Sequence, residues 1–161
     1  MTTSFEDLRV LRTAEEIADA VWKRVARWDE FARDVVGKQL ARATDSIGAN
    51  IAESFGRFNF GEKLQFLYYA RGSLFETKYW LNRARARGLM SSSEVQEYVS
   101  RLTGLARQLN SFADSLKAQR SGSQKQPKTL REAAAEYGVN LPDDFPATNL
   151  FDADDFAWLE S

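Results

Sequence analysis

Apolar residues recur every three to four positions along four successive stretches of the chain, a spacing that places them on one face of an α-helix. The first stretch follows Ser4 and Asp7, which have the spacing of a helix-capping box. Its apolar positions are Leu8, Leu11, Ala14, Ile17, Ala18, Val21, Val25 and Trp28. We predict a helix here, followed by a short connection around residues 29–35.

The second and third stretches are separated by Gly56, which is a candidate C-cap. The second apolar stripe consists of Val36, Leu40, Ala43, Ile47, Ile51 and Phe55. Asn59 and Glu62 have capping-box spacing and predict the start of a third helix. Its apolar positions are Leu64, Leu67, Tyr68, Leu74, Phe75 and Leu81, widened by Phe60, Phe66, Tyr69, Tyr79 and Trp80. Gly88 followed by Leu89 predicts that this helix ends in a Schellman motif.

The fourth stretch has the most regular pattern. Ser91 and Glu94 form the third capping-box pair. The apolar positions that follow are Val95, Tyr98, Val99, Leu102, Leu105, Leu109, Phe112 and Leu116. Four amphipathic helices joined by short connections pack as antiparallel neighbours, so we predict an all-α, up-down-up-down four-helix bundle over residues 1–120.

The composition changes at residues 121–127, which resemble a flexible linker. Within the remaining tail, residues 130–137 favour a short helix, and acidic residues alternate with aromatic residues after it. We predict a flexible acidic tail over residues 121–161, for which two interpretations are open. It is a disordered solubilising segment, or it docks on a partner or a neighbouring subunit through its aromatic residues. Those docking candidates are Phe145, Phe151, Phe156 and Trp158.

The chain contains neither Cys nor His, which excludes thiolate catalysis, zinc–thiolate sites and Ser-His-Asp hydrolysis. It has no apolar run long enough to span a membrane, and residues 1–7 do not resemble a signal peptide. We therefore expect a cytoplasmic protein without a cofactor or a metal ion.

The net charge of −1 conceals an asymmetry. Residues 1–120 hold 19 Lys and Arg against 15 Asp and Glu, a balance of +4, whereas residues 121–161 hold 3 against 8, a balance of −5. A basic body with an acidic tail is typical of a polyanion-binding surface that the tail competes for, or of ordinary solubilising charge. The candidate nucleic-acid contacts are Arg9, Arg12, Lys23, Arg24, Arg27, Arg83 and Arg87.

A polar row runs beside the apolar stripe of the second helix: Ser46, Asn50, Glu53 and Arg57. Glu53 and Glu76 are the one plausible carboxylate pair for catalysis, but without His or an acidic cluster we interpret the row as packing between helices or subunits. The same interpretation extends to Gly72, Ser73 and Glu76 on the third helix, where small residues permit close approach.

The third helix has more aromatic surface than one core stripe needs. Tyr69, Tyr79 and Trp80 are the excess residues, and they indicate either a subunit interface or a large core.

Two motifs carry a family resemblance. Residues 39–43 read Gln-Leu-Ala-Arg-Ala, and residues 46–53 read Ser-Ile-Gly-Ala-Asn-Ile-Ala-Glu, followed by Arg57. Residues 66–76 read Phe-Leu-Tyr-Tyr-Ala-Arg-Gly-Ser-Leu-Phe-Glu, and Leu109 and Asn110 follow in the last helix. Together they resemble the bacterial four-helix-bundle family that includes the 23S rRNA intervening-sequence proteins and the accessory variability determinant proteins of diversity-generating retroelements.

The resemblance covers residues 5–118 and leaves the tail outside. The family usually has Gly where this chain has Ser54, and Pro in the region occupied here by residues 28–31. What the resemblance implies is a homopentameric barrel with a central pore and a basic outer surface. In the retroelement members, that surface binds a reverse transcriptase and nucleic acid.

We therefore expect a non-enzymatic, homo-oligomeric and pentameric accessory protein that binds RNA or DNA, or a nucleic-acid-processing protein such as a reverse transcriptase. The alternative is a protein–protein adaptor whose bundle only multimerises the acidic aromatic tail, which recruits the partner. Removal of residues 121–161 separates the two, because only the first function resides in the bundle.

Overall fold

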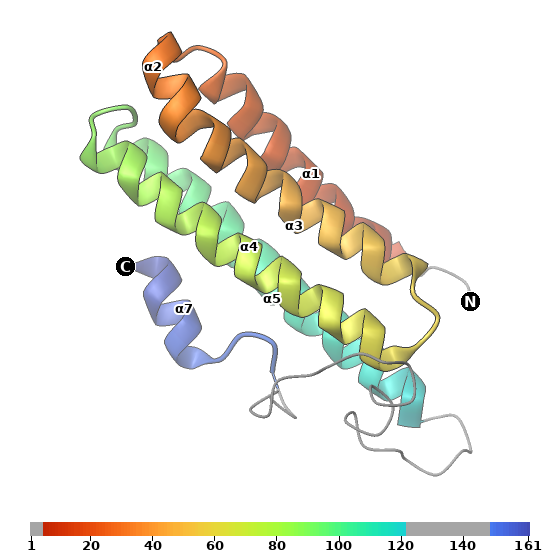
Figure 1. Ribbon diagram of the computed structural model, residues 1–161. Helices are drawn as coiled ribbons and strands as arrows, with labels where there is room; N and C mark the ends of the chain where they lie inside the picture. The colour runs from red at the N-terminus through yellow and green to blue at the C-terminus, as the bar shows by residue number, and fades with distance from the viewer. Residues whose placement is uncertain (1–4, 122–148) are drawn as a thin grey trace.

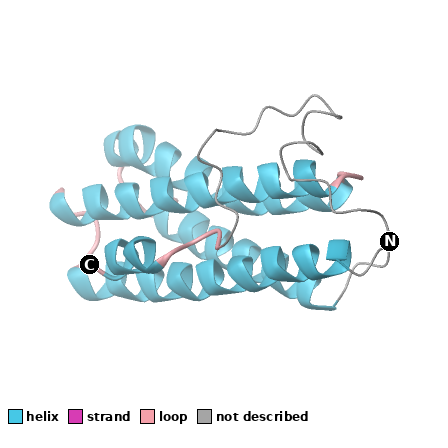
Figure 2. Cartoon of the chain, turned by 90° about the horizontal axis from the view of Figure 1, so that it is seen from below, coloured by secondary structure: helices cyan, strands magenta, loops and turns pink. Residues whose placement is uncertain are grey.

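The computed structural model describes residues 5–121 and 149–161, and every regular element in these ranges is helical (Figure 1, Figure 2). The elements are α1 (Phe5–Val25), α2 (Glu30–Ala32), the π-helical segment η1 (Arg33–Gly37), α3 (Lys38–Gly56), α4 (Phe60–Ala86), α5 (Ser92–Ser121) and α7 (Ala153–Glu160). Ser4 of the first capping box, most of the linker, the predicted helix at residues 130–137 and Phe145 lie outside the described residues.

The four long helices form an antiparallel bundle (Figure 1). α3 packs against α1 and α4, and α5 packs against α4 and α1, so each long helix has two long neighbours. Short connections join them, which forces consecutive helices to run in opposite directions. The predicted all-α bundle is confirmed.

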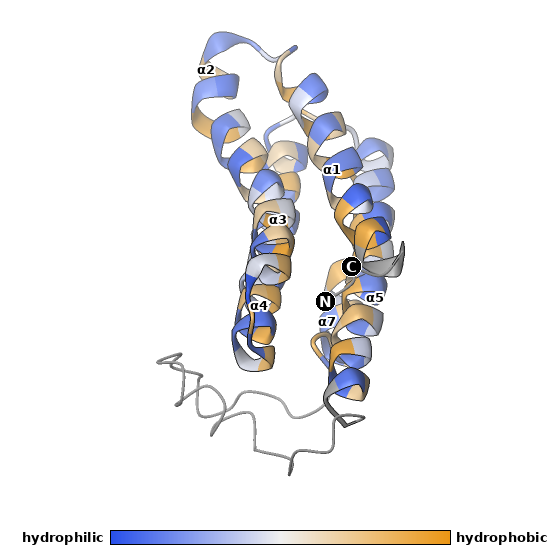
Figure 3. Ribbon diagram, turned by 90° about the vertical axis from the view of Figure 1, so that its right-hand side faces the viewer, coloured by the Kyte–Doolittle hydropathy of each residue, from blue (hydrophilic) through white to orange (hydrophobic). Residues whose placement is uncertain are grey.

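The core is the apolar seam that these helices share. Hydrophobic and hydrophilic residues alternate around the helices in Figure 3, as amphipathic helices require. All the apolar positions predicted for α5 are buried or half-buried. In α1 the prediction was wrong at one position: Leu8 is 54% exposed, and Val10 is buried instead. Val10 is four residues before Ala14 and so shares its face, whereas Leu8 falls on the flank.

The predicted connection at residues 29–35 is wrong, because the chain is helical from Glu30 onward. The turn lies earlier, and Asp29 ends it: its Oδ1 accepts a hydrogen bond from the Ala32 amide at 3.0 Å. An N-capping Asp thus begins this helical run. Gly37 does not break the helix. A Cβ there would lie 2.5 Å from Val25 Cγ1, so Gly37 permits close packing of η1 against α1.

The predicted helix ends are partly confirmed. Gly88 has a φ of +74°, and the Leu89 amide bonds the Ala84 carbonyl at 2.9 Å, as a Schellman motif requires. Gly56, in contrast, is the last helical residue, and the chain leaves the helix through the extended residue Arg57. Gly56 is therefore not a left-handed cap.

Of the predicted capping boxes at Asn59 and Ser91, only the second is half formed. Asn59 is the N-cap residue of α4, but its Nδ2 donates to Glu62 Oε2 at 3.2 Å and its side chain does not cap the backbone. Ser91 Oγ accepts from the Glu94 amide at 3.2 Å, whereas the Glu94 carboxylate pairs with Arg24 of α1. In both boxes the acidic side chain makes a different contact.

The C-terminal residues 149–161 do not form the predicted flexible tail. They form α7 and a short approach to it, and α7 packs against α5. A complete capping box begins the helix: Asp155 N donates to Asp152 Oδ1, and Asp152 N donates to Asp155 Oδ2, both at 2.9 Å. The mixture of acidic and apolar residues that suggested disorder is here an amphipathic helix that needs the bundle to bury its apolar side.

We predict that Gly88→Ala lowers the free energy of unfolding by about 1 kcal/mol, because an L-residue at this positive φ is strained. Gly104→Ala is the control. Gly104 lies inside α5, and an added Cβ would meet nothing within 4 Å, so the substitution should raise the free energy of unfolding by up to about 1 kcal/mol. Urea denaturation measures both, and shifts of the same sign would contradict the prediction.

Candidate functional site and interaction surfaces

The polar row of α3 is bonded mainly to its own helix. Ser46 Oγ donates to the Arg42 carbonyl, and Asn50 Nδ2 donates to the Ser46 carbonyl, both at 2.8 Å. Glu53 pairs with Arg57 one turn later. The Asn50 amide thus donates within α3 and not to a neighbouring helix of the described chain.

Arg57 is the member of the row that contacts α4. Its Nη1 lies 3.9 Å from Glu62 Oε1, and its guanidinium lies 4.5 Å from the centroid of the Phe66 ring. The ion pair is long, so the stacked ring is the better contact of the two. That the rest of the row lies between subunits stays a prediction.

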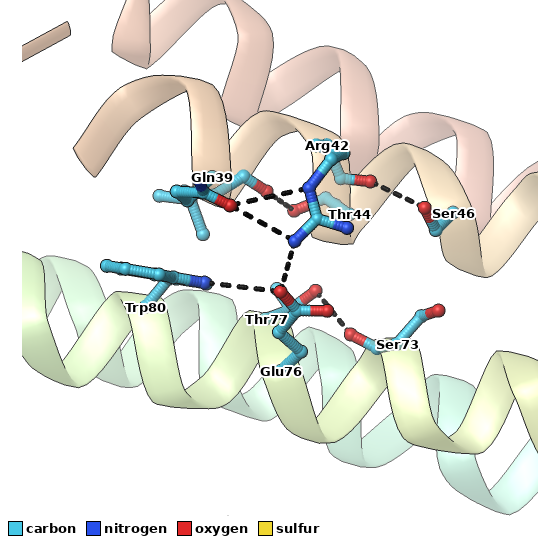
Figure 4. A network of polar contacts seen from close by, with 9 residues as sticks. Gln39, Arg42, Thr44, Ser46, Ser73, Glu76, Thr77 and Trp80 are labelled. Atoms are coloured by element: carbon cyan, nitrogen blue, oxygen red, sulfur yellow. Dashed lines mark hydrogen bonds and ion pairs between the residues drawn. The ribbon is translucent and has the colours of Figure 1, made fainter. Parts of the chain in front are cut away.

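A second polar contact joins α3 to α4 at Glu76 (Figure 4). Its carboxylate pairs with Arg42, whose Nη2 also donates to Gln39 Oε1 at 3.1 Å. Trp80 Nε1 approaches Glu76 Oε1 at 3.4 Å. The pair is partly exposed, so its contribution to stability is small, about 0–1 kcal/mol. Its main effect is to fix the register of α3 against α4.

Glu53 and Glu76 do not form a carboxylate pair. Glu76 lies beside Arg42, and Glu53 is eleven residues further along α3, a helical distance of about 16 Å. Each carboxylate has its own arginine. Within residues 5–121 and 149–161, no three Asp or Glu side chains are grouped as a metal site would require.

Gly72 and Ser73 lie where no helix of the same chain approaches closely. Gly72 is exposed, and an added Cβ would meet nothing within 4 Å. Ser73 contributes its carbonyl to the Thr77 hydroxyl at 2.8 Å. Among the described residues, no neighbouring helix makes the expected close approach at Gly72.

Arg24 has a structural contact instead of an exposed charge. It pairs with Glu94, donates to the Leu89 carbonyl at 3.0 Å, and lies 5.9 Å from the centroid of the Trp28 ring. The hydrogen bond to Glu94 raises the pKa of Arg24 above its ordinary value. These contacts tie the last turn of α1 to the α4–α5 turn, and Glu94 neutralises the charge.

The other basic candidates divide between the two ends of the bundle. Arg9 and Arg12 are exposed near the start of α1. At the opposite end, Lys23, Arg27 and Arg87 are exposed on or beside the last turns of α1 and α4. The contact of Arg24 with Leu89 shows that these last turns meet at one end. Arg83 is half-buried, and its guanidinium lies 5.9 Å from the centroid of the Tyr79 ring.

The α1–α3 face is acidic. A groove of about 450 Å³ lies there, lined by small residues and by Glu15, Asp19 and Asp45. Burial raises the pKa of Asp45, and the nearby charge of Asp19 raises it further. The carboxylates give this face a negative charge, which is unfavourable for a polyanion.

The extra aromatic residues of α4 fall into two groups, one packed against the core and one exposed. Trp80 packs against the core, whereas Tyr69 and Tyr79 are each about half exposed. Trp22, Phe31 and Phe58 are exposed as well, and the sequence interpretation did not identify them. Trp22 and Phe31 lie off the apolar stripes, which is the signal that could have found them.

The aromatic tail residues dock on the chain's own bundle. Phe151 is buried, Phe156 is half-buried, and Trp158 lies with its ring centroid 5.3 Å from that of Phe75. Asn110 of α5 holds the Phe151 backbone: its Nδ2 donates to the carbonyl at 2.9 Å, and its Oδ1 accepts from the amide at 2.7 Å.

Two arginines that the sequence interpretation missed complete this site. Arg71 Nη2 donates to Asp155 Oδ1 at 2.9 Å, and Arg107 Nη2 donates to Glu160 Oε1 at 3.3 Å. The opposite charges of bundle and tail were the available signal. The charge count could not say which arginines face the tail.

Lys78 is the least expected residue of the core. It is only 2% exposed, and its Nζ lies 5.8 Å from the centroid of the Trp158 ring. Burial lowers the pKa of Lys78, and the charge of Arg85 lowers it further. Burial of the charged form is unfavourable, and α7 contributes an aromatic face to the ammonium.

A known protein family matches most of the four-helix bundle. The family model of the 23S rRNA-intervening sequence protein matches residues 6–111, more than half of the chain. The chain belongs to this family. No curated protein matches the chain. The matched range includes both sequence motifs and Asn110, whereas α7 lies outside it.

Ser54, which follows the second motif of α3, is buried, and its hydroxyl donates to the Ile51 carbonyl at 2.6 Å. The small side chain thus satisfies its own polar group within α3. None of the helices in the described ranges combines the length and apolar composition needed to cross a bilayer.

We predict that Lys78→Met raises the free energy of unfolding at pH 7, by on the order of 1 kcal/mol, because it removes a buried charge. Between the lowered folded pKa and the unfolded pKa of about 10.4, the unfolded chain binds more protons, so wild-type stability rises with pH in that window. The difference between variant and wild type should therefore shrink on approach to pH 10.4.

Chemical denaturation at pH 7, 9 and 10.4 measures this difference. Lys38→Met is the control, because the Lys38 side chain is 71% exposed and carries no comparable burial cost. An advantage of Lys78→Met that stays constant over this range contradicts the prediction.

Proposed function

We propose that this protein is a non-enzymatic accessory protein that works as a homo-oligomer, most simply a pentamer, and binds nucleic acid or a nucleic-acid-processing protein such as a retroelement reverse transcriptase. Members of its family are generally small helical proteins without a catalytic role. The observation that supports nucleic-acid binding is the exposed basic end of the bundle, formed by Lys23, Arg27 and Arg87. None of these three has an ion-pair partner among the described residues.

The distribution of charge favours this end over the other faces. The α1–α3 face carries Asp19 and Asp45, and α7 covers the side of α4 and α5 that presents Arg71 and Arg107. Phosphate affinity grows with the number of cationic contacts, so several copies of a three-cation end bind a polyanion far better than one.

An exposed strip of α4 supports assembly. Tyr69, Gly72, Glu76 and Tyr79 are spaced by three and four residues and so share one face of the helix. The tyrosines supply the aromatic contact area that protein interfaces favour. Gly72 leaves open space between them, in which a helix of another subunit can approach.

The adaptor alternative is less well supported. It needs the aromatic residues of the tail to be accessible to a partner, whereas Phe151 is buried and Phe156 half-buried against the bundle. Deletion of residues 121–161 distinguishes the two functions. The accessory function predicts that the bundle keeps or gains nucleic-acid affinity, and the adaptor function predicts that all partner binding is lost.

We predict that joint replacement of Lys23, Arg27 and Arg87 by Gln weakens binding to single-stranded RNA and duplex DNA oligonucleotides. Three lost contacts should reduce the slope of log affinity against log salt for duplex DNA by up to about 2.7. Fluorescence anisotropy at 50 to 200 mM salt measures both quantities.

Arg9→Gln with Arg12→Gln is the matched control at the opposite end of α1 and should change the slope less. An unchanged slope in the triple variant, or equal losses in both variants, contradicts the proposed basic end.

We predict that Gly72→Ala weakens the assembly. In an isolated chain the added Cβ meets nothing, so the substitution should stabilise α4 by up to about 1 kcal/mol. At a subunit contact the same methyl group pushes the partner away, and the oligomer dissociates at higher protein concentration. Light scattering measures the mass, with Gly104→Ala as the control; a wild-type monomer at micromolar concentration contradicts the proposed oligomer.

A further inference from the structure

The side of α4 and α5 that holds residues 149–161 has the features of a peptide-recognition site. Asn110 binds the main chain of the segment, because its side chain makes hydrogen bonds to both the amide and the carbonyl of Phe151. An Asn that makes both bonds to one residue specifies where the segment begins, independently of its side chains. These two hydrogen bonds also satisfy the Phe151 amide and carbonyl, which lie just before α7 and have no partner within that helix.

Apolar anchors supply most of the binding area. Leu150, Phe151 and Leu159 are all at least 95% buried. Phe75 of α4 lies between the two ends of the segment, with ring centroids 5.8 Å from Phe151 and 5.3 Å from Trp158. The spacing of these anchors suits a Leu-Phe pair followed by about two helical turns that reach Leu159.

Charge complementarity completes the recognition. Residues 149–161 contain four acidic residues and no Lys or Arg. Arg71 pairs with Asp155 and Arg107 pairs with Glu160, so two cations of the bundle meet two carboxylates of the segment. Asp155 also closes the capping box of α7. The segment therefore carries its own helix start and needs no help from the bundle to begin the helix.

The covalent connection is much longer than docking on the same chain requires. α5 continues for eleven residues beyond Asn110, a distance of about 16 Å. Residues 122–148 supply 27 residues, which can span up to about 90 Å. Within a homo-oligomer, a connection of this length can also reach a groove on a neighbouring subunit, and binding there is then intramolecular within the assembly.

We propose that this α4–α5 site is a receptor for the C-terminal segment of a second copy of the chain, so that subunits exchange residues 149–161 and are linked by them. The site takes an acidic peptide that begins with a Leu-Phe pair, continues as a short helix, and buries a Leu near the end of that helix. The exchange rests on the proposed homo-oligomer. It is separate from the basic end and needs no nucleic acid.

Two full-length variants test the exchange by complementation. One has a damaged site, Asn110→Ala, and the other has a damaged segment, Phe151→Ala with Leu159→Ala. Each variant alone should dock its segment more weakly than the wild type, because Asn110→Ala leaves the Phe151 amide and carbonyl without their partner and the other variant lacks two anchors. When the two are mixed, only the second offers an intact site to the intact segment of the first.

Hydrogen–deuterium exchange followed by mass spectrometry measures docking of residues 149–161, and the altered masses of the two segments identify the copies. We expect exchange in the intact segment to slow by about tenfold or more on mixing. Asn110→Asp is a second site variant of the same shape, which retains an acceptor for the Phe151 amide and loses the donor to its carbonyl. Phe58→Ala, at an exposed residue, is the control that should not affect docking.

A synthetic peptide of residues 149–161 is the second probe, added to the segment-damaged variant. It should protect Lys78, which lies under Trp158, from acylation, while the exposed Lys38 stays reactive. Protection by the peptide without protection on mixing shows that the site serves only the chain's own segment and overturns the exchange. Failure of both probes overturns the peptide site itself. If the wild-type protein has the mass of a monomer while the peptide still protects Lys78, the proposed assembly is contradicted and the peptide site is not.

Discussion

The structure depends on one constraint, which is that α4 carries apolar side chains around most of its circumference. Leu67, Leu74 and Leu81 fill the bundle core, while Phe75 and Trp80 lie on its other sides. Packing along a single seam cannot bury all the apolar surface of such a helix. α3 and α5 cover two of its sides, α7 covers Phe75, and the strip with Tyr69 and Tyr79 remains open to another molecule.

The docked C-terminal helix shows how apolar and polar contacts divide the work. Burial of a Leu or Phe side chain is worth about 1.5–3 kcal/mol, whereas partly exposed ion pairs are worth about 0–1 kcal/mol. Leu150, Phe151 and Leu159 therefore supply most of the affinity of α7 for the bundle. Asn110 and Arg71 supply its position, because misplacement leaves their partners without a hydrogen bond. The same division lets one short segment bind a site specifically without making it permanent.

Much of the fold could be predicted from the residues, and the exceptions depend on contacts between helices. The regular stripe of α5 and the Schellman end at Gly88 need only nearest-neighbour geometry, so both were predictable. The helical run after Asp29 was mistaken for a connection, because the close packing that Gly37 permits there is a contact with Val25 of another helix. The candidate site was less predictable for the same reason: Asn110 meets Phe151 across 41 residues, and Arg42 meets Glu76 across 34.

The amino-acid sequence by itself determined the helices, the family and the absence of Cys and His chemistry, because periodicity and inventory are properties of the chain. It also separated a basic body from an acidic tail. Only the tertiary structure decided which charges remain exposed. Arg24, Arg71 and Arg107 meet carboxylates of other elements, whereas Lys23, Arg27 and Arg87 have no ion pair among the described residues, and that pairing depends on which helices become neighbours. Tertiary packing likewise turned a segment with the composition of a disordered tail into a helix, because its apolar anchors are stable only where α4 and α5 offer them a surface.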